Sequence, residues 1–327
     1  MPHRPIMLGI VGDSAAGKTT LTAGIAQVIG VDQVTTICTD DYHRYDRARR
    51  KELGITPLHP SCNYIDIIEQ HLRALADGHP ILKPVYNHST GSFDPPEYVR
   101  PKPFVLVEGL LAFHSARMRE CFDVKVYLDP PEELRRRWKV SRDCAKRGYT
   151  PDEVLAELER REVDSAAHIR PQKRWADLVV RFYPPSQPAD YERLNVQLTM
   201  RATLEHPDLS GVIARSGNGA AALRLAVGRE HGRLAEFLEV SGSVDADQAV
   251  AIEEAVWAQR AHLQRLLPGG SGNFVDGNQT RQSYPLAIAQ LLVAYQLLLG
   301  RFTKEEHARS LTPPGPLARS IASSPDA

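Results

Sequence analysis

Residues 39–51 bring acidic and basic side chains close together in the chain. The segment reads TDDYHRYDRARRK and follows a short apolar, β-branched run at residues 34–37. In open sheets of parallel strands, ligands bind beyond the carboxyl ends of the strands, so Asp40, Asp41 and His43 would face a bound ligand. A carboxylate at that position can accept the proton of a substrate hydroxyl group, and Asp40 is placed to do so.

A second segment provides a site for phosphate groups. GDSAAGKT, residues 12–19, fits the pattern GxxxxGK[ST] and lies between an apolar run at 6–11 and a helical pattern at 19–29. Backbone N–H groups in such a loop wrap around phosphate oxygens at the start of a helix. Lys18 would reach the β- and γ-phosphates, and Thr19 would bind Mg²⁺. The residues expected to bind the ATP phosphates are Gly12, Asp13, Ser14, Ala15, Ala16, Gly17, Lys18, Thr19 and Thr20.

This motif predicts nucleotide binding and leaves three classes of protein open: a small-molecule kinase, a GTPase-type switch and an ATPase motor. The sequence contains no NKxD motif for guanine, which weakens the switch, and no second nucleotide domain, which weakens the motor. A kinase that phosphorylates an alcohol group is favoured, because it would use the carboxylate of Asp40.

Two basic clusters suggest that the acceptor already carries a phosphate. The first contains Arg47, Arg50 and Lys51, although a solvated charged helix at 46–52 explains these residues equally well. The second lies in a basic helix expected at 131–147, where four side chains fall on one face of about 140°. They are Lys139, Arg142, Asp143 and Arg147. Asp143 would lie near the metal or align the arginines; surface pairing of Asp143 with Arg147 is the alternative.

Two further segments offer polar groups. Glu108 ends an apolar run in VLVEGLL and fits the acidic residue that supports Mg²⁺ at a second strand end. It is otherwise a strand-end glutamate beside a glycine. Residues 83–97 are polar and rich in turn formers, and Tyr86, Asn87 and His88 there could bind sugar hydroxyls; a plain surface loop is equally compatible.

The elements that must position these residues alternate between strand and helix in the first half of the chain. Strands are expected at 6–11, 34–38, 104–107, 124–128 and 178–182, and helices at 19–29, 64–77, 131–147 and from 150 onward. This pattern predicts an α/β fold with a mostly parallel sheet flanked by helices, of the P-loop NTPase type. We expect a kinase core at 1–188, a smaller α+β extension of the same body at 189–303 and a disordered tail at 304–327. In the extension, strands are expected at 192–202, 222–227 and 234–241, and helices near 246–266 and 283–299.

The composition argues against several other classes of protein. The 40 basic and 40 acidic residues give a formal net charge of zero, which does not favour binding to nucleic acid or to an anionic membrane. The longest apolar run, 286–299, is too short to span a bilayer and suggests a buried or interface helix. The four cysteines are scattered, without a zinc or disulfide pattern. We therefore expect a soluble, cytoplasmic protein.

Together these segments resemble the phosphoribulokinase family, in particular the form found in cyanobacteria, plants and some archaea. The resemblance is carried, in order, by GDSAAGKTT, VTTICTDDYHRYDRARRKELGITPLHP, ILKPVYNHSTGSFDPPE, VLVEGLL, VKVYLD, WKVSRDCAKRGYTPDEVLAEL and IRPQKRWADLVV. It covers about residues 6–184 and is weak from about residue 190 onward. It implies the conversion of ribulose 5-phosphate and ATP, with Mg²⁺, to ribulose 1,5-bisphosphate, by an enzyme that is usually a dimer or larger.

The resemblance also implies roles for single residues. Asp40 would be the general base on the C1 hydroxyl, and Lys18 and Lys139 would stabilise the transferring phosphoryl group. The residues near Mg²⁺ would be Thr19, Glu108 and Asp143. The residues holding the sugar phosphate would be His43, Arg47, Lys51, Tyr86, His88 and Arg142, with support from Arg147.

Two departures from the family pattern matter. Ala16 stands where the plant and cyanobacterial form has a redox-active cysteine whose partner corresponds to Cys38, so we predict no thioredoxin-type control through this pair. The family's EGLHP is here EGLLA, with Leu111 in place of histidine, which leaves room for a different sugar phosphate. Alternatives are therefore a related kinase of uridine or of another sugar phosphate, and a nucleotide-binding regulator without turnover. The basic clusters and an aromatic content of 7% argue against uridine.

Overall fold

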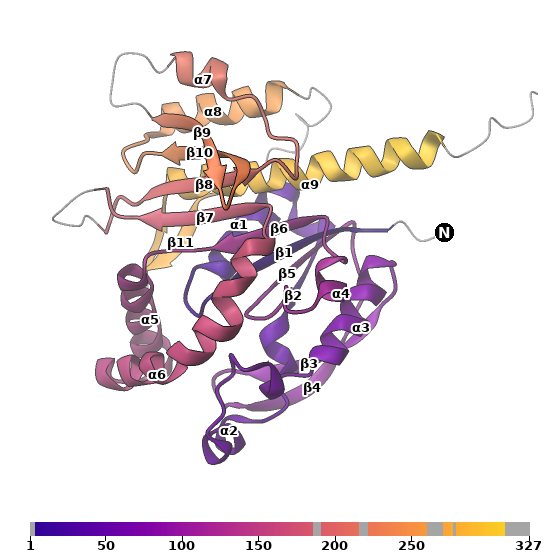
Figure 1. Ribbon diagram of the computed structural model, residues 1–327, viewed down its shortest axis with the longest axis vertical. Helices are drawn as coiled ribbons and strands as arrows, with labels where there is room; N and C mark the ends of the chain where they lie inside the picture. Colours follow the sequence, from indigo (N-terminus) through magenta and orange to yellow (C-terminus); the bar gives the residue numbers. More distant parts are fainter. Residues whose placement is uncertain (1–3, 186–190, 216–221, 260–270, 277–278, 311–327) are drawn as a thin grey trace, which may run out of the picture.

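An eight-stranded sheet forms the centre of the computed structural model, which describes residues 4–185, 191–215, 222–259, 271–276 and 279–310 (Figure 1). The strand order is β2-β5-β1-β6-β7-β8-β10-β9. The first five strands in this order are parallel, which confirms the expected sheet. They are β1 (Ile6–Gly12), β2 (Val34–Cys38), β5 (Phe104–Gly109), β6 (Val124–Leu128) and β7 (Leu178–Tyr183).

Helices cover both faces of the parallel strands, which is why these strands are apolar throughout. Ile10 of β1 belongs to the cluster on the face covered by α1 (Lys18–Ile29) and α9 (Tyr284–Ser310). The next residue, Val11, belongs to the cluster of the opposite face, under α3 (Ile65–Ala76) and α4 (Ala116–Arg119). Successive residues of a strand point to opposite faces, so a strand buried on both sides loses the apolar–polar alternation.

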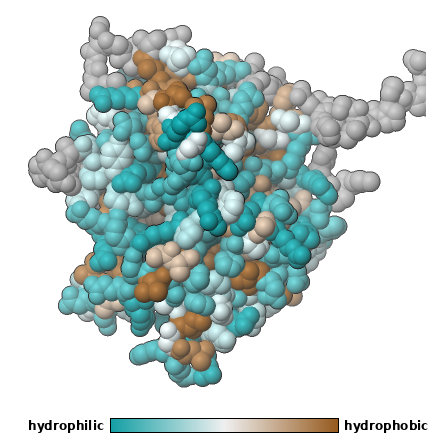
Figure 2. Space-filling model, viewed as in Figure 1, coloured by the Kyte–Doolittle hydropathy of each residue, from teal (hydrophilic) through white to brown (hydrophobic). Residues whose placement is uncertain are grey.

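Two further helices lie beside the end of the parallel strands (Figure 1). α5 (Glu132–Arg147) packs against α6 (Pro151–Asp164). α6 begins with the capping box predicted from TPDE, in which Thr150 and Glu153 satisfy each other's backbone N–H groups. A π-helical segment, η4 (Ser165–Ile169), and a 3₁₀ segment, η5 (Arg170–Trp175), follow it. The face of the molecule over α5 and α6 is mainly hydrophilic (Figure 2).

The segment after β2 and the polar segment 83–97 are more regular than the sequence suggested. Residues 39–42 form a 3₁₀ turn, η2 (Thr39–Tyr42), and α2 (Arg47–Leu53) follows with Asp46 as its N-cap. Residues 83–97, expected as a loop, form most of a hairpin of β3 (Ile81–Asn87) and β4 (Ser92–Val99). Prolines argue against a strand inside a sheet, but both strands of this two-stranded ribbon are edges, and the pairing shifts at Pro84.

The extension continues the same sheet. β8 (Asn195–Arg201) pairs antiparallel with β7, and β10 (Arg233–Val240) and β9 (Leu223–Glu230) follow it. The remaining elements are α7 (Ser210–Arg215), α8 (Ala246–Ala258) and a small hairpin of β11 (Asn273–Asp276) and β12 (Gln279–Gln282). Residues 260–266 of the helix expected at 246–266 lie outside the described residues.

Helix α9 is longer than predicted and largely buried. Its stretch Tyr284–Lys304 is long and apolar enough to cross a membrane, but 67% of an apolar 18-residue segment of it is buried inside the molecule. It packs against α1, α8, β1 and β8, as a core helix does. The helix continues to Ser310, so residues 304–310 of the expected tail are helical; residues 311–327 lie outside the described residues.

Candidate active site

The sheet brings the phosphate loop, Asp40 and Glu108 together at the carboxyl ends of its parallel strands. Glu108 at the end of β5 lies level with Ile10 of β1 and with Cys38 of β2. The phosphate loop begins two residues after Ile10, and Asp40 comes two residues after Cys38. Because the three strands are parallel neighbours, these groups converge beyond their carboxyl ends, where ligands bind in such sheets.

The phosphate loop has the backbone that anion binding requires. Ala15 and Gly17 have φ angles of 65° and 95°, in the left-handed region. Alternation of the backbone between right- and left-handed conformations turns successive N–H groups inward, and α1 begins directly afterwards with unpaired N–H groups. Lys18 Nζ donates to the carbonyl oxygens of Gly12 and Asp13, each at 3.0 Å, so its charge lies over the loop.

Asp13 fixes the loop to the rest of the molecule through residues that the sequence did not single out. Its carboxylate accepts a hydrogen bond from Ser165 Oγ, and Arg135 Nη1 lies 3.7 Å from it. Arg135 Nη1 also donates to the carbonyl of Ser14 at 3.1 Å. Arg135 precedes Lys139 by one helical turn, so helical periodicity could have identified it; nothing local identifies Ser165.

Thr19 and Glu108 form a pair suited to a hard cation. Thr19 Oγ1 donates to Glu108 Oε1 at 3.0 Å, while the buried Oε2 atom of Glu108 has no hydrogen-bond partner among the described residues. Burial raises the pKa of Glu108, against the charge of Lys18 and the Thr19 bond. Carboxylate and hydroxyl oxygens are ligands that Mg²⁺ prefers, so the two residues fit this ion at the start of α1.

Asp40 is oriented by the strand beside it. Its Oδ1 atom accepts the Leu110 N–H at 3.1 Å, and Oδ2 has no hydrogen bond to other described residues. The close approach depends on Gly109, where a Cβ atom would lie 1.8 Å from Thr39 Oγ1 and 3.2 Å from Asp40 Oδ1. Asp41 does not face the site, because Lys83 Nζ lies 2.5 Å from its Oδ2 and the Tyr86 N–H donates to Oδ1.

His43 and Tyr86 form the inner wall of the expected acceptor site. His43 is buried, and its Nδ1 lies 2.7 Å from Asn63 Oδ1. Burial lowers the pKa of His43 to about 4, although Asp40 opposes the shift, so the ring is neutral at physiological pH. Tyr86 is enclosed by His43, by Phe93 and by Arg50, which donates to its hydroxyl at 2.6 Å.

The hairpin carries the outer wall. His88 is exposed, and its ring centroid lies 5.0 Å from that of Tyr86. Arg47 Nη2 donates to the His88 carbonyl at 2.5 Å, which joins α2 to the hairpin. Although the residue is exposed, desolvation by the surrounding protein lowers the pKa of His88; the charges of Arg147 and Arg142 act in the same direction, and Asp40 opposes them. The hairpin therefore lies near both Asp40 and the cations of α5.

The basic face of α5 is organised around one carboxylate. Asp143 is bound by Lys139 at 2.8 Å, by Arg142 at 2.8 Å and by Arg147 at 3.5 Å. Burial opposes ionisation of Asp143, but the bonds and charges of Arg142 and Lys139 outweigh it and lower the pKa to about 2. Both oxygens are engaged by cations, so the geometry supports the expected alignment of the arginines rather than contact with a metal.

Lys139 itself is nearly inaccessible to solvent. Burial, followed by the charge of Arg161, lowers its pKa to about 8, although Asp143 opposes the shift. Arg161 is another residue that the sequence did not indicate: it lies on α6, and the charges of Arg50, Asp143 and Asp13 all act on it. Its position joins the two basic clusters, which lie about 100 residues apart in the chain.

The side chains of two positions discussed from the sequence, Lys51 and Leu111, take no part in the hydrogen bonds and ion pairs of the site residues described above. Lys51 is exposed in the last turn of α2, and its side chain makes no hydrogen bond or ion pair with other described residues. Leu111 is buried in a small apolar cluster with Leu58, Leu110 and Ile169. A leucine there is a packing residue behind the strand end, which explains why this position accepts an apolar side chain.

The two positions of the redox pair lie in the phosphate loop and at the end of β2. Ala16 is fully buried in the phosphate loop, and Cys38 is a free cysteine. Burial, together with the charges of Asp40 and Glu108, raises the pKa of Cys38 well above its ordinary value. A thiol held in its protonated form is a poor nucleophile.

Comparison with known proteins agrees with this geometry. Residues 7–187 match the family model described as the phosphoribulokinase / uridine kinase family. A phosphoribulokinase of Synechocystis sp. is 41% identical over 200 residues, which cover 61% of this chain and 60% of that protein. A chloroplastic phosphoribulokinase of Triticum aestivum is 37% identical over 219 residues, 61% of this chain and 54% of that protein. The chain thus spans little more than half the length of these relatives.

More distant proteins share the core or the fold. A uridine kinase of Latilactobacillus sakei is 32% identical over 180 residues, which cover 54% of this chain and 85% of that protein. The solved structure of a phosphoribulokinase from Rhodobacter spheroides superposes with a TM-score of 0.59 at 18% identity. It covers 80% of this chain and 98% of that one, so the shared fold extends beyond the kinase core.

Proposed function

The chain belongs to the phosphoribulokinase / uridine kinase family, and from this membership we propose that it phosphorylates ribulose 5-phosphate at the C1 hydroxyl, using ATP and Mg²⁺. The observation that carries the proposal is the arrangement at the sheet edge. The Oδ1 atom of Asp40 is fixed by the Leu110 N–H, and the phosphate loop and the Thr19–Glu108 pair lie at the same edge.

Asp40 is the general base in this reaction. With Oδ1 held by the backbone, Oδ2 accepts the proton of the C1 hydroxyl while the oxygen attacks the γ-phosphorus of ATP. The fixed orientation keeps the carboxylate within reach of the attacking oxygen and costs no rearrangement during the reaction.

Cations stabilise the phosphoryl group as it moves. Lys18 lies over the phosphate loop, and Lys139 approaches from α5, where Asp143 aligns it. Thr19 and Glu108 would hold Mg²⁺, which neutralises charge on the β- and γ-phosphate oxygens. Asp143, expected near the metal, is proposed here to position Lys139, Arg142 and Arg147 instead.

The acceptor site favours a substrate that already bears a phosphate. Arg47, Arg142 and Arg147 lie around the hairpin residues, and each can pair with phosphate oxygens. His43 and Tyr86 provide neutral polar groups for sugar hydroxyls. The Tyr86 ring is already enclosed by Arg50, His43, His88 and Phe93, which leaves little of it for stacking on a uracil base.

Replacing Asp40 by asparagine tests the mechanism. Turnover, measured as ADP release with Mg-ATP and ribulose 5-phosphate, should fall by about 10²–10⁴-fold, because asparagine cannot accept the proton. ATP affinity should stay close to that of the wild type. Asp32→Asn, an exposed acid outside the site, is the matched control. If Asp40→Asn keeps full activity, Asp40 is not the base.

The same assay tests the acceptor. Ribulose 5-phosphate is compared with ribose 5-phosphate and uridine at equal concentrations. We expect turnover with ribulose 5-phosphate alone; preferential turnover of uridine would assign the chain to the other activity of its family. We also expect the homodimer implied by the resemblance, which the mass of the protein in solution would show.

A further inference from the structure

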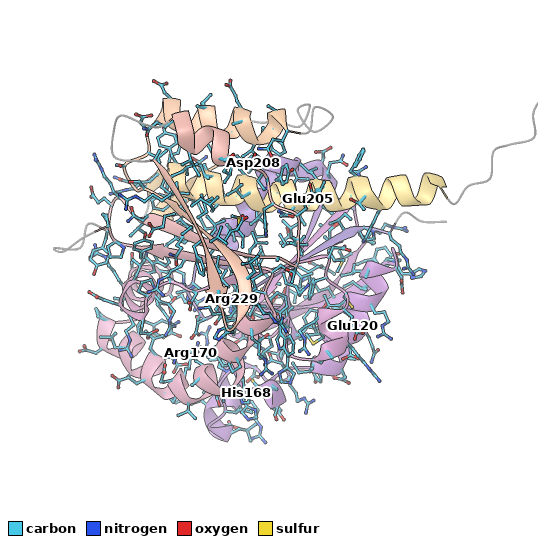
Figure 3. All side chains as sticks on the ribbon, turned by 45° about the horizontal axis from the view of Figure 1, so that its top comes forward. Glu120, His168, Arg170, Glu205, Asp208 and Arg229 are labelled. Atoms are coloured by element: carbon cyan, nitrogen blue, oxygen red, sulfur yellow. The ribbon has the colours of Figure 1, made fainter. Side chains whose placement is uncertain are left out.

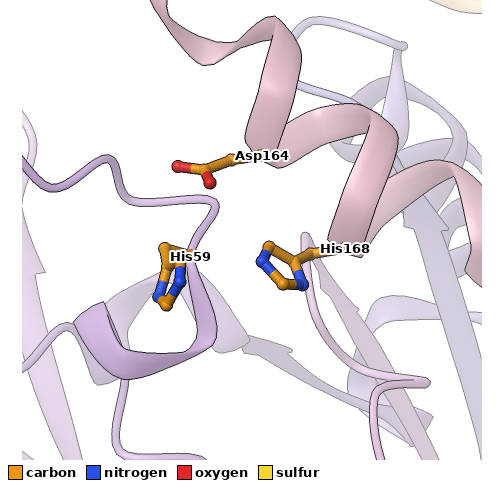
Figure 4. Close-up of side chains that lie close together, drawn as sticks. All are labelled: His59, Asp164 and His168. Carbon is orange, nitrogen blue, oxygen red and sulfur yellow. The ribbon is translucent and has the colours of Figure 1, made fainter.

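Three side chains behind the active site gather around one point. His59 is the N-cap of the 3₁₀ turn η3 (Pro60–Cys62), Asp164 is the last residue of α6, and His168 lies in the π-helical segment η4. Each offers a metal-ligating atom, and these atoms lie within 4.8 Å of one another. Figure 4 shows the carboxylate and the two rings facing the same space.

The three side chains are partly buried and held by their neighbours. Thr56 Oγ1 donates to Asp164 Oδ2 at 2.6 Å, which fixes the carboxylate. The two imidazole rings meet edge to face, with centroids 4.9 Å apart. Single-turn π-helices often occur at functional sites, and here the π-turn places His168 next to Asp164.

We propose that His59, Asp164 and His168 bind a transition-metal ion of the zinc class, with a water molecule as the fourth ligand. Two imidazoles and one carboxylate suit zinc-class ions, whereas Mg²⁺ prefers oxygen ligands alone. The site is therefore chemically distinct from the Thr19–Glu108 pair. It lies at the end of α6, where Figure 3 labels His168.

Two features keep this binding moderate and reversible. Ligand atoms around a tetrahedral ion lie ~3.3 Å apart, given bonds of about 2.0–2.1 Å, so the side chains must draw together. The Nδ1 atom of His59 also accepts the Ser61 N–H at 3.1 Å. A neutral imidazole has one free nitrogen lone pair, so an ion bound by His59 replaces that hydrogen bond.

An ion at this site would connect residues that contact the phosphate loop with residues that contact the expected acceptor site. Ser165, next to Asp164, donates to Asp13 of the phosphate loop. On the other side, the His59 carbonyl accepts from Asn63 Nδ2 at 3.0 Å, and Asn63 Oδ1 lies 2.7 Å from His43 Nδ1. A bound metal ion would thus link the segment around Ser165, which contacts the phosphate loop, to the segment around Asn63, which contacts His43.

Binding to the full chain tests the proposal without any kinase activity. Metal-free protein, with no nucleotide or sugar present, is dialysed against Zn²⁺ or Co²⁺, and bound metal and Tm are measured. We expect about one bound ion and a higher Tm for the wild type, and loss of both effects in His168→Ala and in Asp164→Asn. Asp164→Asn keeps an acceptor for Thr56, so it preserves the local fold. His79→Ala removes an exposed histidine that follows α3 and should behave as the wild type.

Cobalt adds a direct signature. A Co²⁺ ion held by two imidazoles, a carboxylate and water should show the intense visible absorption of tetrahedral coordination, absent in both ligand variants. The proposal is wrong if the wild type binds no ion, or if Asp164→Asn and His168→Ala bind as much as His79→Ala. Neither outcome depends on the proposed reaction, so the two proposals fail separately.

Discussion

Lys139 is buried, yet the proposed reaction requires its protonated, charged form. Its pKa of about 8 lies close to physiological pH because burial and Arg161 disfavour the ammonium form and Asp143 only partly restores it. The proposed reaction uses the protonated amine to stabilise negative charge on the phosphoryl group. Lys139 is thus the residue of the site whose charge is most sensitive to pH on the alkaline side.

This sensitivity predicts an alkaline limb in the pH profile. kcat/KM should fall above about pH 8, because it reports the ionisation of the free enzyme and the neutral amine cannot stabilise the transferring group. In Lys139→Arg the limb should disappear or move well above pH 8, even if the maximum rate is lower, because arginine stays protonated. An unchanged limb near pH 8 in that variant would assign the ionisation to another group.

At the residue scale, short motifs located the candidate site, and the residues that support it from distant parts of the chain were missed. The phosphate loop and Asp40 are identified by local sequence, because a Gly-rich turn between strand and helix leaves few alternatives. Ser165 and Asn63 act through hydrogen bonds that span 152 and 20 positions in the chain, and Arg161 acts electrostatically on groups as distant in sequence as Arg50 and Asp13. No spacing rule connects residues so far apart.

Helix α5 is an element whose function depends on one buried acid. Asp143 brings three cations onto one face, and without it Lys139 would remain buried close to the positive charge of Arg161. Removing one partner of a buried ion pair is more costly than removing both, because the other charge stays desolvated.

We therefore predict that Asp143→Asn lowers the free energy of unfolding by roughly 3–5 kcal/mol at neutral pH. The folded-state pKa of Asp143 is about 2, below its ordinary 3.8, so the ion pairs stabilise the fold above pH 4. The stabilisation is lost as the pH falls towards 2. Denaturant titrations at pH 7 and pH 3 should show the difference between wild type and variant shrinking; an equal difference at both values would contradict the assigned pairing.

The hairpin β3–β4 shows why this element could not be predicted. Its prolines and turn formers indicate a loop, and a two-stranded ribbon carries no apolar core that would reveal its period. What holds it is tertiary: Lys83 pairs with Asp41, and Arg47 binds the carbonyl of His88. The residues expected to touch sugar hydroxyls are thus placed by contacts with η2 and α2.

On the scale of the whole molecule, the kinase core and the extension share one sheet and one core. β7 pairs with β8 over six residue pairs, and α9 covers the same face as α1. The sequence suggested an extension on the same body, and the strand periods there were visible. It did not show that α9 of the extension packs against α1 of the kinase core.

A chain ending at residue 188 should therefore not fold stably. It would leave β7 with an unpaired edge and remove α9 from the apolar face of α1 and β1. We expect low solubility, no cooperative thermal transition and no ATP binding, whereas a chain ending at residue 310 should match the full chain in all three. A soluble 1–188 fragment that binds ATP with wild-type affinity would disprove this.

One contact between α1 and α9 joins segments that are synthesised far apart in time. Gln290 is fully buried against Gly24, donates to the carbonyl of Thr20 across 270 positions and accepts the Gly272 N–H. At a synthesis rate of about 5–20 residues per second, α1 emerges from the ribosome roughly 15–50 s before its partner. During that interval the nucleotide-binding helix has no cover for its apolar face, so a nascent chain stalled before residue 290 should be a client for chaperones.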